Sequence, residues 1–107
     1  MALTLSTVQP AANTGFYTLT EATFDNSYEE KGEAFTPANA GLASFSHAPL
    51  CFVINGSEAE ANPVDTAYYK EEKLHLIDGK TAKEMAKEKD MSKVKVLVLA
   101  FGKARNK

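Results

Sequence analysis

The chain has 107 residues, of which 44% are hydrophobic and 24% charged, with one cysteine and no tryptophan. This balance excludes a disordered or fibrous chain, and the length fits one domain with one core. A single cysteine excludes an internal disulfide, and the longest apolar stretch, residues 96–101, is far shorter than the roughly 20 residues of a transmembrane helix. We expect a soluble domain without an export signal, in which an N-terminal arm (residues 1–13) precedes a single β domain (residues 14–107).

Charge is distributed unevenly along the chain. The net charge is −2, but residues 1–65 carry eight acidic residues and one lysine, whereas residues 66–107 carry six acidic and eleven basic residues. Opposite charges on two surfaces would favour association, unless the two signs interleave in the folded domain. Acidic residues among the lysines of residues 80–95 argue against binding along a nucleic-acid backbone.

The first half of the chain predicts two strands and a long loop. Residues 3–8 alternate apolar and hydroxyl side chains before Pro10, which is typical of a half-buried or edge strand. Residues 16–24 are rich in threonine and aromatic residues and predict a second strand. Residues 29–42 contain glycine and proline without any period, so we expect a long ordered loop there.

The second half predicts a hairpin, a helix and two central strands. Residues 50–54 are a continuous apolar run, which predicts a strand buried on both faces. Residues 66–77 predict a β-hairpin with Glu71-Glu72 at its tip. A capping-box pattern followed by apolar residues at helical spacing predicts a short helix over residues 81–89. Residues 94–101 predict a second central strand.

These elements favour a mainly β fold, namely a small β-sandwich or jelly-roll-like barrel with one short helix. The pattern of apolar residues on the predicted strands defines the expected core. Its members are Leu5, Phe16, Phe24, Leu42, Phe52, Ile54, Leu74, Leu76, Val96 and Val98.

The residue pattern offers no usual catalytic or metal-binding motif. His47, His75 and Cys51 are too few for a usual zinc site, and Cys51 lies in an apolar run where an unreactive thiol is expected. His75 alternates with apolar neighbours, so we expect it on the exposed face of its strand. Carboxylate pairs fall in expected loops, where solvation is usual. We therefore expect a protein that is not an enzyme and has no cofactor and no metal.

Two stretches resemble a pattern in small virion structural proteins of tailed bacteriophages. The first comprises Phe24-Asp25-Asn26-Ser27-Tyr28, Gly32-Glu33-Ala34-Phe35-Thr36-Pro37-Ala38 and Gly41-Leu42, and the second is Asp90-Met91-Ser92 before the last strand. The charged residues 29–31 and the lysine-rich residues 81–89 depart from that pattern. The resemblance implies a head decoration or cement protein, which binds outside the capsid and joins neighbouring major capsid protein subunits.

Such a role implies location on the virion, and in the host cytoplasm during assembly. The expected partners are the major capsid protein and further copies of the chain in a dimer or trimer, without nucleic acid or membrane. We expect the N-terminal arm, the loop of residues 29–40 and two lysines to make the contacts. The candidate contact residues are Leu3, Leu5, Val8, Tyr28, Phe35, Pro37, Lys83 and Lys87.

A second function remains open on the sequence alone. The chain could be a β-sandwich binding module, or a tail or vertex component of a virion, that recognises a receptor or a carbohydrate. Aromatic side chains would then stack on the ligand. The candidates are Tyr17, Tyr28, Tyr68 and Tyr69.

Overall fold

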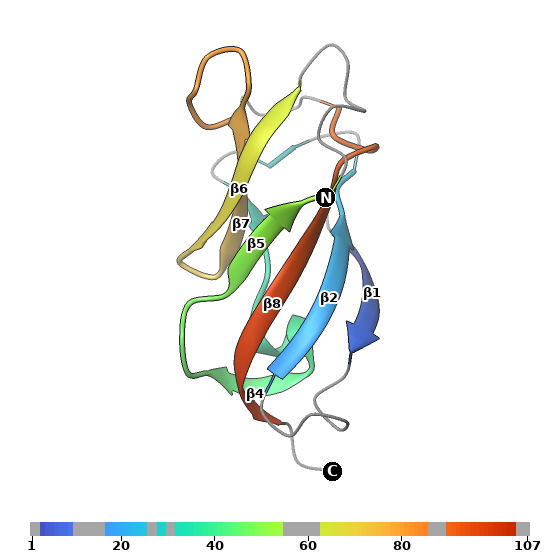
Figure 1. The fold of residues 1–107 in the computed structure, drawn as a ribbon, viewed down its shortest axis with the longest axis vertical. Coiled ribbons are helices and arrows are strands. Elements are labelled where there is room, and N and C mark those ends of the chain that lie inside the picture. Colours follow the sequence, from blue (N-terminus) through green and yellow to red (C-terminus); the bar gives the residue numbers. More distant parts are fainter. Residues whose placement is uncertain are drawn as a thin grey trace.

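The computed structural model describes residues 3–9, 17–25, 28–29, 32–54, 63–85 and 90–104. Within these ranges the chain forms two antiparallel sheets, one of which curls into a half-barrel (Figure 1). The larger sheet contains β1 (Thr4–Gln9), β2 (Tyr17–Thr23), β4 (Leu42–Phe45), β5 (Leu50–Val53) and β8 (Lys95–Ala104). The smaller sheet contains β3 (Glu33–Ala34), β6 (Val64–Lys70) and β7 (Lys73–Asp78), and a 3-10 turn, η1, spans Pro37–Ala40. The predicted mainly β fold is confirmed.

Strand β8 is the central strand of the larger sheet, as predicted. One edge pairs with β2, from Tyr17 opposite Phe101 to Thr23 opposite Lys95. The other edge is shared by two strands, because β5 pairs with the first half of β8 and β4 with its last residues. The approach of β4 requires Gly102, since a Cβ there would lie 1.9 Å from the carbonyl oxygen of Ser44.

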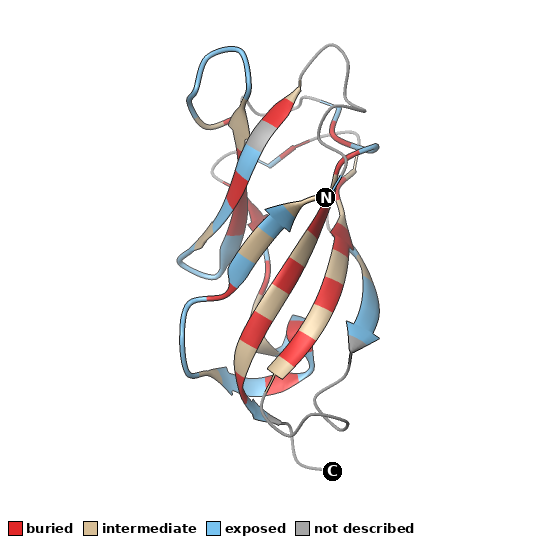
Figure 2. Cartoon of the chain, viewed as in Figure 1, coloured by how far each residue is buried: buried red, intermediate tan, exposed pale blue. Residues whose placement is uncertain are grey.

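The core lies between the two sheets. Alternate residues of β2 and β8 point into it, which Figure 2 shows as alternating bands along both strands. The side chains of Leu5 and Val53 are half-buried and pack against it. Of the expected core residues, Phe16 lies outside the described residues. Those that are buried as expected are Phe24, Leu42, Leu74, Leu76, Val96 and Val98.

The prediction of a doubly buried strand at residues 50–54 is wrong. Leu50, Phe52 and Ile54 are each about half exposed, while Cys51 and Val53 face inward. Hydrogen bonds join β5 to the central strand on one side, and its outward side chains stand on the outer face of the sheet. The side chains of this apolar run therefore alternate between the core and the outer face of the sheet.

The N-terminal segment is part of the larger sheet. Residues 4–9 form the edge strand β1, which pairs with β2 and has a register shift between Thr7 and Gln9. The edge-strand prediction is confirmed for these residues, which do not form a separate arm. The rest of the expected arm, residues 1–2 and 10–13, lies outside the described residues.

The loop expected at residues 29–42 contains β3 and η1. The backbone N–H of Thr36 donates to Asn39 Oδ1 at 2.7 Å, which is part of a capping box at the start of η1. Gly41 ends the turn with a φ of 76°, in the left-handed region that suits glycine. The Thr-Pro-Ala-x-x-Gly-Leu motif is thus a capped turn that leads into β4.

Residues 81–85 do not form the predicted helix. Glu84 forms an isolated antiparallel bridge with Ile77, and the N–H of Met85 donates to the carbonyl of Leu76 at 2.8 Å. Pairing with the end of β7 satisfies these backbone groups and buries Met85, whereas a two-turn helix must overcome a costly nucleation step. Residues 86–89 lie outside the described residues.

The predicted hairpin is confirmed as β6 and β7, joined by Glu71 and Glu72. These residues have φ values of 53° and 64°, so the turn needs the left-handed region at both positions, as a type I′ turn does. Asparagine and glycine adopt that region at a lower energetic cost than glutamate.

We predict that Glu71→Asn combined with Glu72→Gly raises the free energy of unfolding by about 1 kcal/mol, because it relieves this backbone strain. Urea unfolding of both proteins measures the change. Glu71→Gln with Glu72→Gln is the matched control, since it removes both charges and leaves the strain. An equal gain in that control would attribute the effect to charge.

We also predict unequal costs for two truncations. Leu76→Ala should lower the free energy of unfolding by about 2–5 kcal/mol, because Leu76 is fully buried. Phe52→Ala should lower it by about 1 kcal/mol, since half of the Phe52 side chain is already exposed. Denaturant unfolding compares the two, and equal costs would contradict the outward placement of Phe52.

Candidate functional site

A polar cluster joins the β6–β7 hairpin to the rest of the domain. It consists of four side chains, Tyr28, Tyr68, His75 and Glu84. Tyr68 and His75 are cross-strand partners, and their rings stack with centroids 4.6 Å apart. Tyr28 follows β2, and Glu84 is placed beside β7 by its backbone bridge to Ile77.

The carboxylate of Glu84 is the centre of this cluster. His75 Nδ1 lies 2.8 Å from Oε1 and 3.0 Å from Oε2 of Glu84. The hydroxyl of Tyr68 donates to Oε1 at 3.1 Å, and the hydroxyl of Tyr28 donates to Oε2. With a carboxylate as acceptor, a protonated Nδ1 of His75 can donate to Glu84.

His75 is buried, which corrects the expected exposed position. It is 7% exposed, and its Nε2 lies 3.4 Å from the carbonyl oxygen of Lys70. The face of β7 opposite the apolar core is therefore covered by the stacked Tyr68 ring and by Glu84. Alternation along a strand predicts the face of a residue, but not what covers that face.

Burial and the neighbouring carboxylate raise the pKa of two tyrosine hydroxyls in the cluster. Burial, followed by the hydrogen bond to Glu84, raises the pKa of Tyr28 above its ordinary value. The same two causes raise the pKa of the more exposed Tyr68. The hydroxyl of Tyr28 also accepts a hydrogen bond from the backbone N–H of Leu76 at 2.9 Å. Both phenols therefore remain protonated donors at neutral pH.

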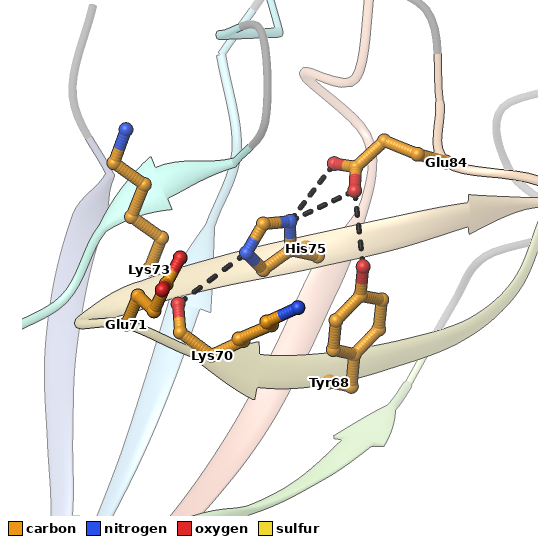
Figure 3. Close-up of a pocket in the computed structure, with 6 residues that line it drawn as sticks. All are labelled: Tyr68, Lys70, Glu71, Lys73, His75 and Glu84. Atoms are coloured by element: carbon orange, nitrogen blue, oxygen red, sulfur yellow. Dashed lines mark hydrogen bonds and ion pairs between the residues drawn. The ribbon is translucent and has the colours of Figure 1, made fainter.

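A hollow of about 450 Å³ opens beside the cluster and is drawn in Figure 3. Tyr68, Lys70, Glu71, Lys73, His75 and Glu84 line it. The ammonium group of Lys73 points away from His75 in this view, while both Glu84 oxygens already accept hydrogen bonds. The arrangement suits a structural link that holds separate segments of the chain together. Within the described ranges, no three His, Cys, Asp or Glu side chains are placed to hold a metal ion.

Two of the predicted contact residues lie in the core. Tyr28 is 1% exposed and Phe35 is fully buried, so neither side chain is available to a partner. Their aromatic rings pack internally, Tyr28 against Phe24 and Phe35 against Phe45. An aromatic residue beside turn residues is thus a poor indicator of a contact surface.

The remaining contact candidates are scattered. Leu3 and Leu5 are half-buried against the core, and Val8 is exposed on β1. Pro37 begins η1 and is partly exposed, and Lys83 is exposed. Lys87 lies outside the described residues. The members of this set that the structure describes lie on or next to β1, on η1 and beside the end of β7, and they do not form one site.

An apolar surface that the sequence did not predict covers the outer face of the larger sheet. Register aligns Leu50 with Leu99 and Leu19, and Phe52 with Leu97, across three neighbouring strands. We call this surface the apolar sheet face. Its members are Leu19, Leu50, Phe52, Leu97, Leu99 and Phe101.

Comparison of the chain with protein-family models, curated proteins and solved structures found no significant match. In the described part of the chain, no helix has the length and apolar character needed to cross a membrane.

We predict that Tyr28→Phe lowers the free energy of unfolding at pH 7 by about 1–3 kcal/mol, because the N–H of Leu76 loses its buried acceptor. The raised pKa of Tyr28 also links stability to pH. Its contribution is fully present below the ordinary tyrosine pKa of about 10 and falls as pH rises above it. Unfolding of wild type and variant between neutral and alkaline pH should give a shallower loss for the variant. Parallel profiles would contradict this linkage.

Proposed function

We propose that the protein is a non-enzymatic capsid decoration protein, which binds the outer surface of a phage head and joins neighbouring major capsid subunits. The observation that carries the proposal is that the two stretches that resemble small phage virion proteins contact each other in the folded domain. The N–H of Phe24 donates to the carbonyl of Val94 at 3.1 Å, and the N–H of Met91 donates to the carbonyl of Asp25 at 2.9 Å. Residues more than 60 positions apart thus form one junction.

The other motif residues support the same framework. Gly32 has a φ of 103°, and a Cβ there would lie 2.8 Å from the carbonyl oxygen of Leu74, so the close approach of this segment to β7 favours glycine. Asp90 Oδ1 accepts a hydrogen bond from the N–H of Ser92 at 2.9 Å, which forms the turn before β8. These residues specify a rigid β framework, and the outward positions are left to contact a partner.

A decoration protein depends on protein contacts repeated over many copies. Each contact can be weak, because attachment at several points raises the effective concentration of the next contact. The polar cluster fits this role as a structural link within the domain, since its hydrogen-bonding groups are directed at one another. Exposed apolar side chains on β5 and on β1 offer surface for protein contacts.

Particles of the phage that encodes this chain provide the test. We predict hundreds of copies per particle by quantitative mass spectrometry, in a fixed ratio to the major capsid protein, and added surface density in electron micrographs relative to particles that lack the chain. Purified chain added to deficient particles should restore both. A dozen copies or fewer would instead indicate a tail or vertex component, and absence from particles would refute the proposal.

A further inference from the structure

The apolar sheet face is unusual because it lies outside a domain that already has a core. The inward side chains of β8, such as Val96 and Val98, are fully buried, and the outward Leu97 and Leu99 are partly exposed. Leu50 and Phe52 extend this surface across β5, where each is 50% exposed. The sheet thus has apolar side chains on both faces, and burial alternates along β2 and β8 accordingly (Figure 2).

The size of the apolar sheet face is that of an interaction surface. Leu50 and Phe52 are half exposed and the other four members are partly exposed, which leaves on the order of 400 Å² of side-chain surface in contact with water. The largest exposed apolar patch on a typical monomeric protein covers about 300–600 Å² and is often functional.

We infer that the apolar sheet face binds a second copy of this chain, in a two-fold dimer that packs the two sheets face to face. The charges on this side of the sheet favour that occupant. Glu21 and Lys95 border one end of the face, where Lys95 Nζ lies 3.8 Å from Glu21 Oε1, and the exposed Lys103 borders the other end. A two-fold axis across the strands sets Lys103 of each copy toward the end of the other copy that carries Glu21, so opposite charges meet on both sides of the contact.

The shape of the surface also fits a copy of itself. A hollow of about 370 Å³ lies at one end, lined by His47, Ala48, Leu50 and Phe101. Phe52 projects from the same strand as Leu50, two residues along. In a two-fold arrangement each copy would insert an apolar side chain beside the hollow of the other, with the sheets about 10 Å apart.

The buried area sets the strength of this dimer. Two faces of this size remove at most about 800 Å² from water, which is in the range of weak, transient protein contacts. The dimer should therefore be weak and reversible, and its population should rise with protein concentration. On a surface that holds many copies close together, the same contact would be occupied more fully.

Sedimentation equilibrium of the purified full chain tests the inference without any capsid. From low micromolar to about 1 mM, the average mass of the wild type should rise from the chain mass of 11.6 kDa toward twice that value. Phe52→Glu, and separately Leu50→Glu, should stay at the chain mass, because each places a carboxylate from both copies in an apolar contact. Ala34→Glu is the matched control, as it adds the same charge at an exposed strand position of the smaller sheet and should dimerise like the wild type.

Circular dichroism and thermal melting establish that each variant is folded, and two variants are used so that a folding defect in one does not decide the result. Sulfate should strengthen the association, because apolar contacts tighten in salting-out ions. A wild type that remains monomeric to about 1 mM, assembly beyond the dimer, or undiminished dimerisation of both glutamate variants would overturn the inference. Any of these results leaves the capsid role standing, since that role is measured by particle binding.

Discussion

The hydrogen bonding of β8 on both edges is the constraint on which the other elements depend. One edge fixes the register of β2 along seven residue pairs, and the other places β5 and β4 end to end. Because side chains alternate along a strand, this one pairing defines two surfaces. Val96 and Val98 close the core, whereas Leu97 and Leu99 join the outward residues of the neighbouring strands. Core and outer face are therefore set by the same hydrogen bonds.

The polar cluster attaches the smaller sheet to this framework. A small domain buries a limited fraction of its apolar surface, so a fully hydrogen-bonded carboxylate can contribute noticeably to its stability. Glu84 binds one residue from each strand of the hairpin and, through Tyr28, the segment that follows β2. The hairpin and the body of the domain are thus connected by directional bonds as well as by packing.

Local patterns predicted the mainly β fold, the hairpin and the central strand β8, because turn residues and strand periodicity act over a few positions. These patterns failed where contacts between residues distant in the sequence determine the structure. The apolar run at residues 50–54 has the same appearance whether its second face meets a core or the outside, and residues 81–85 pair with β7 in place of forming a helix. The link from Tyr28 to Glu84 spans 56 positions and has no spacing signal. The stacking of Tyr68 on His75 was within reach, since a two-residue turn at Glu71-Glu72 makes them cross-strand partners.

Strand β1 forms one border of the larger sheet, and its register shift between Thr7 and Gln9 affects more than its own pairing with β2. A β-bulge twists a border strand and interrupts the regular row of donors and acceptors that another strand would need. Proline follows at position 10 and cannot donate a backbone hydrogen bond. This border is therefore poorly suited to growth by strand addition. Chains crowded together can meet through their side chains without merging their sheets into aggregates.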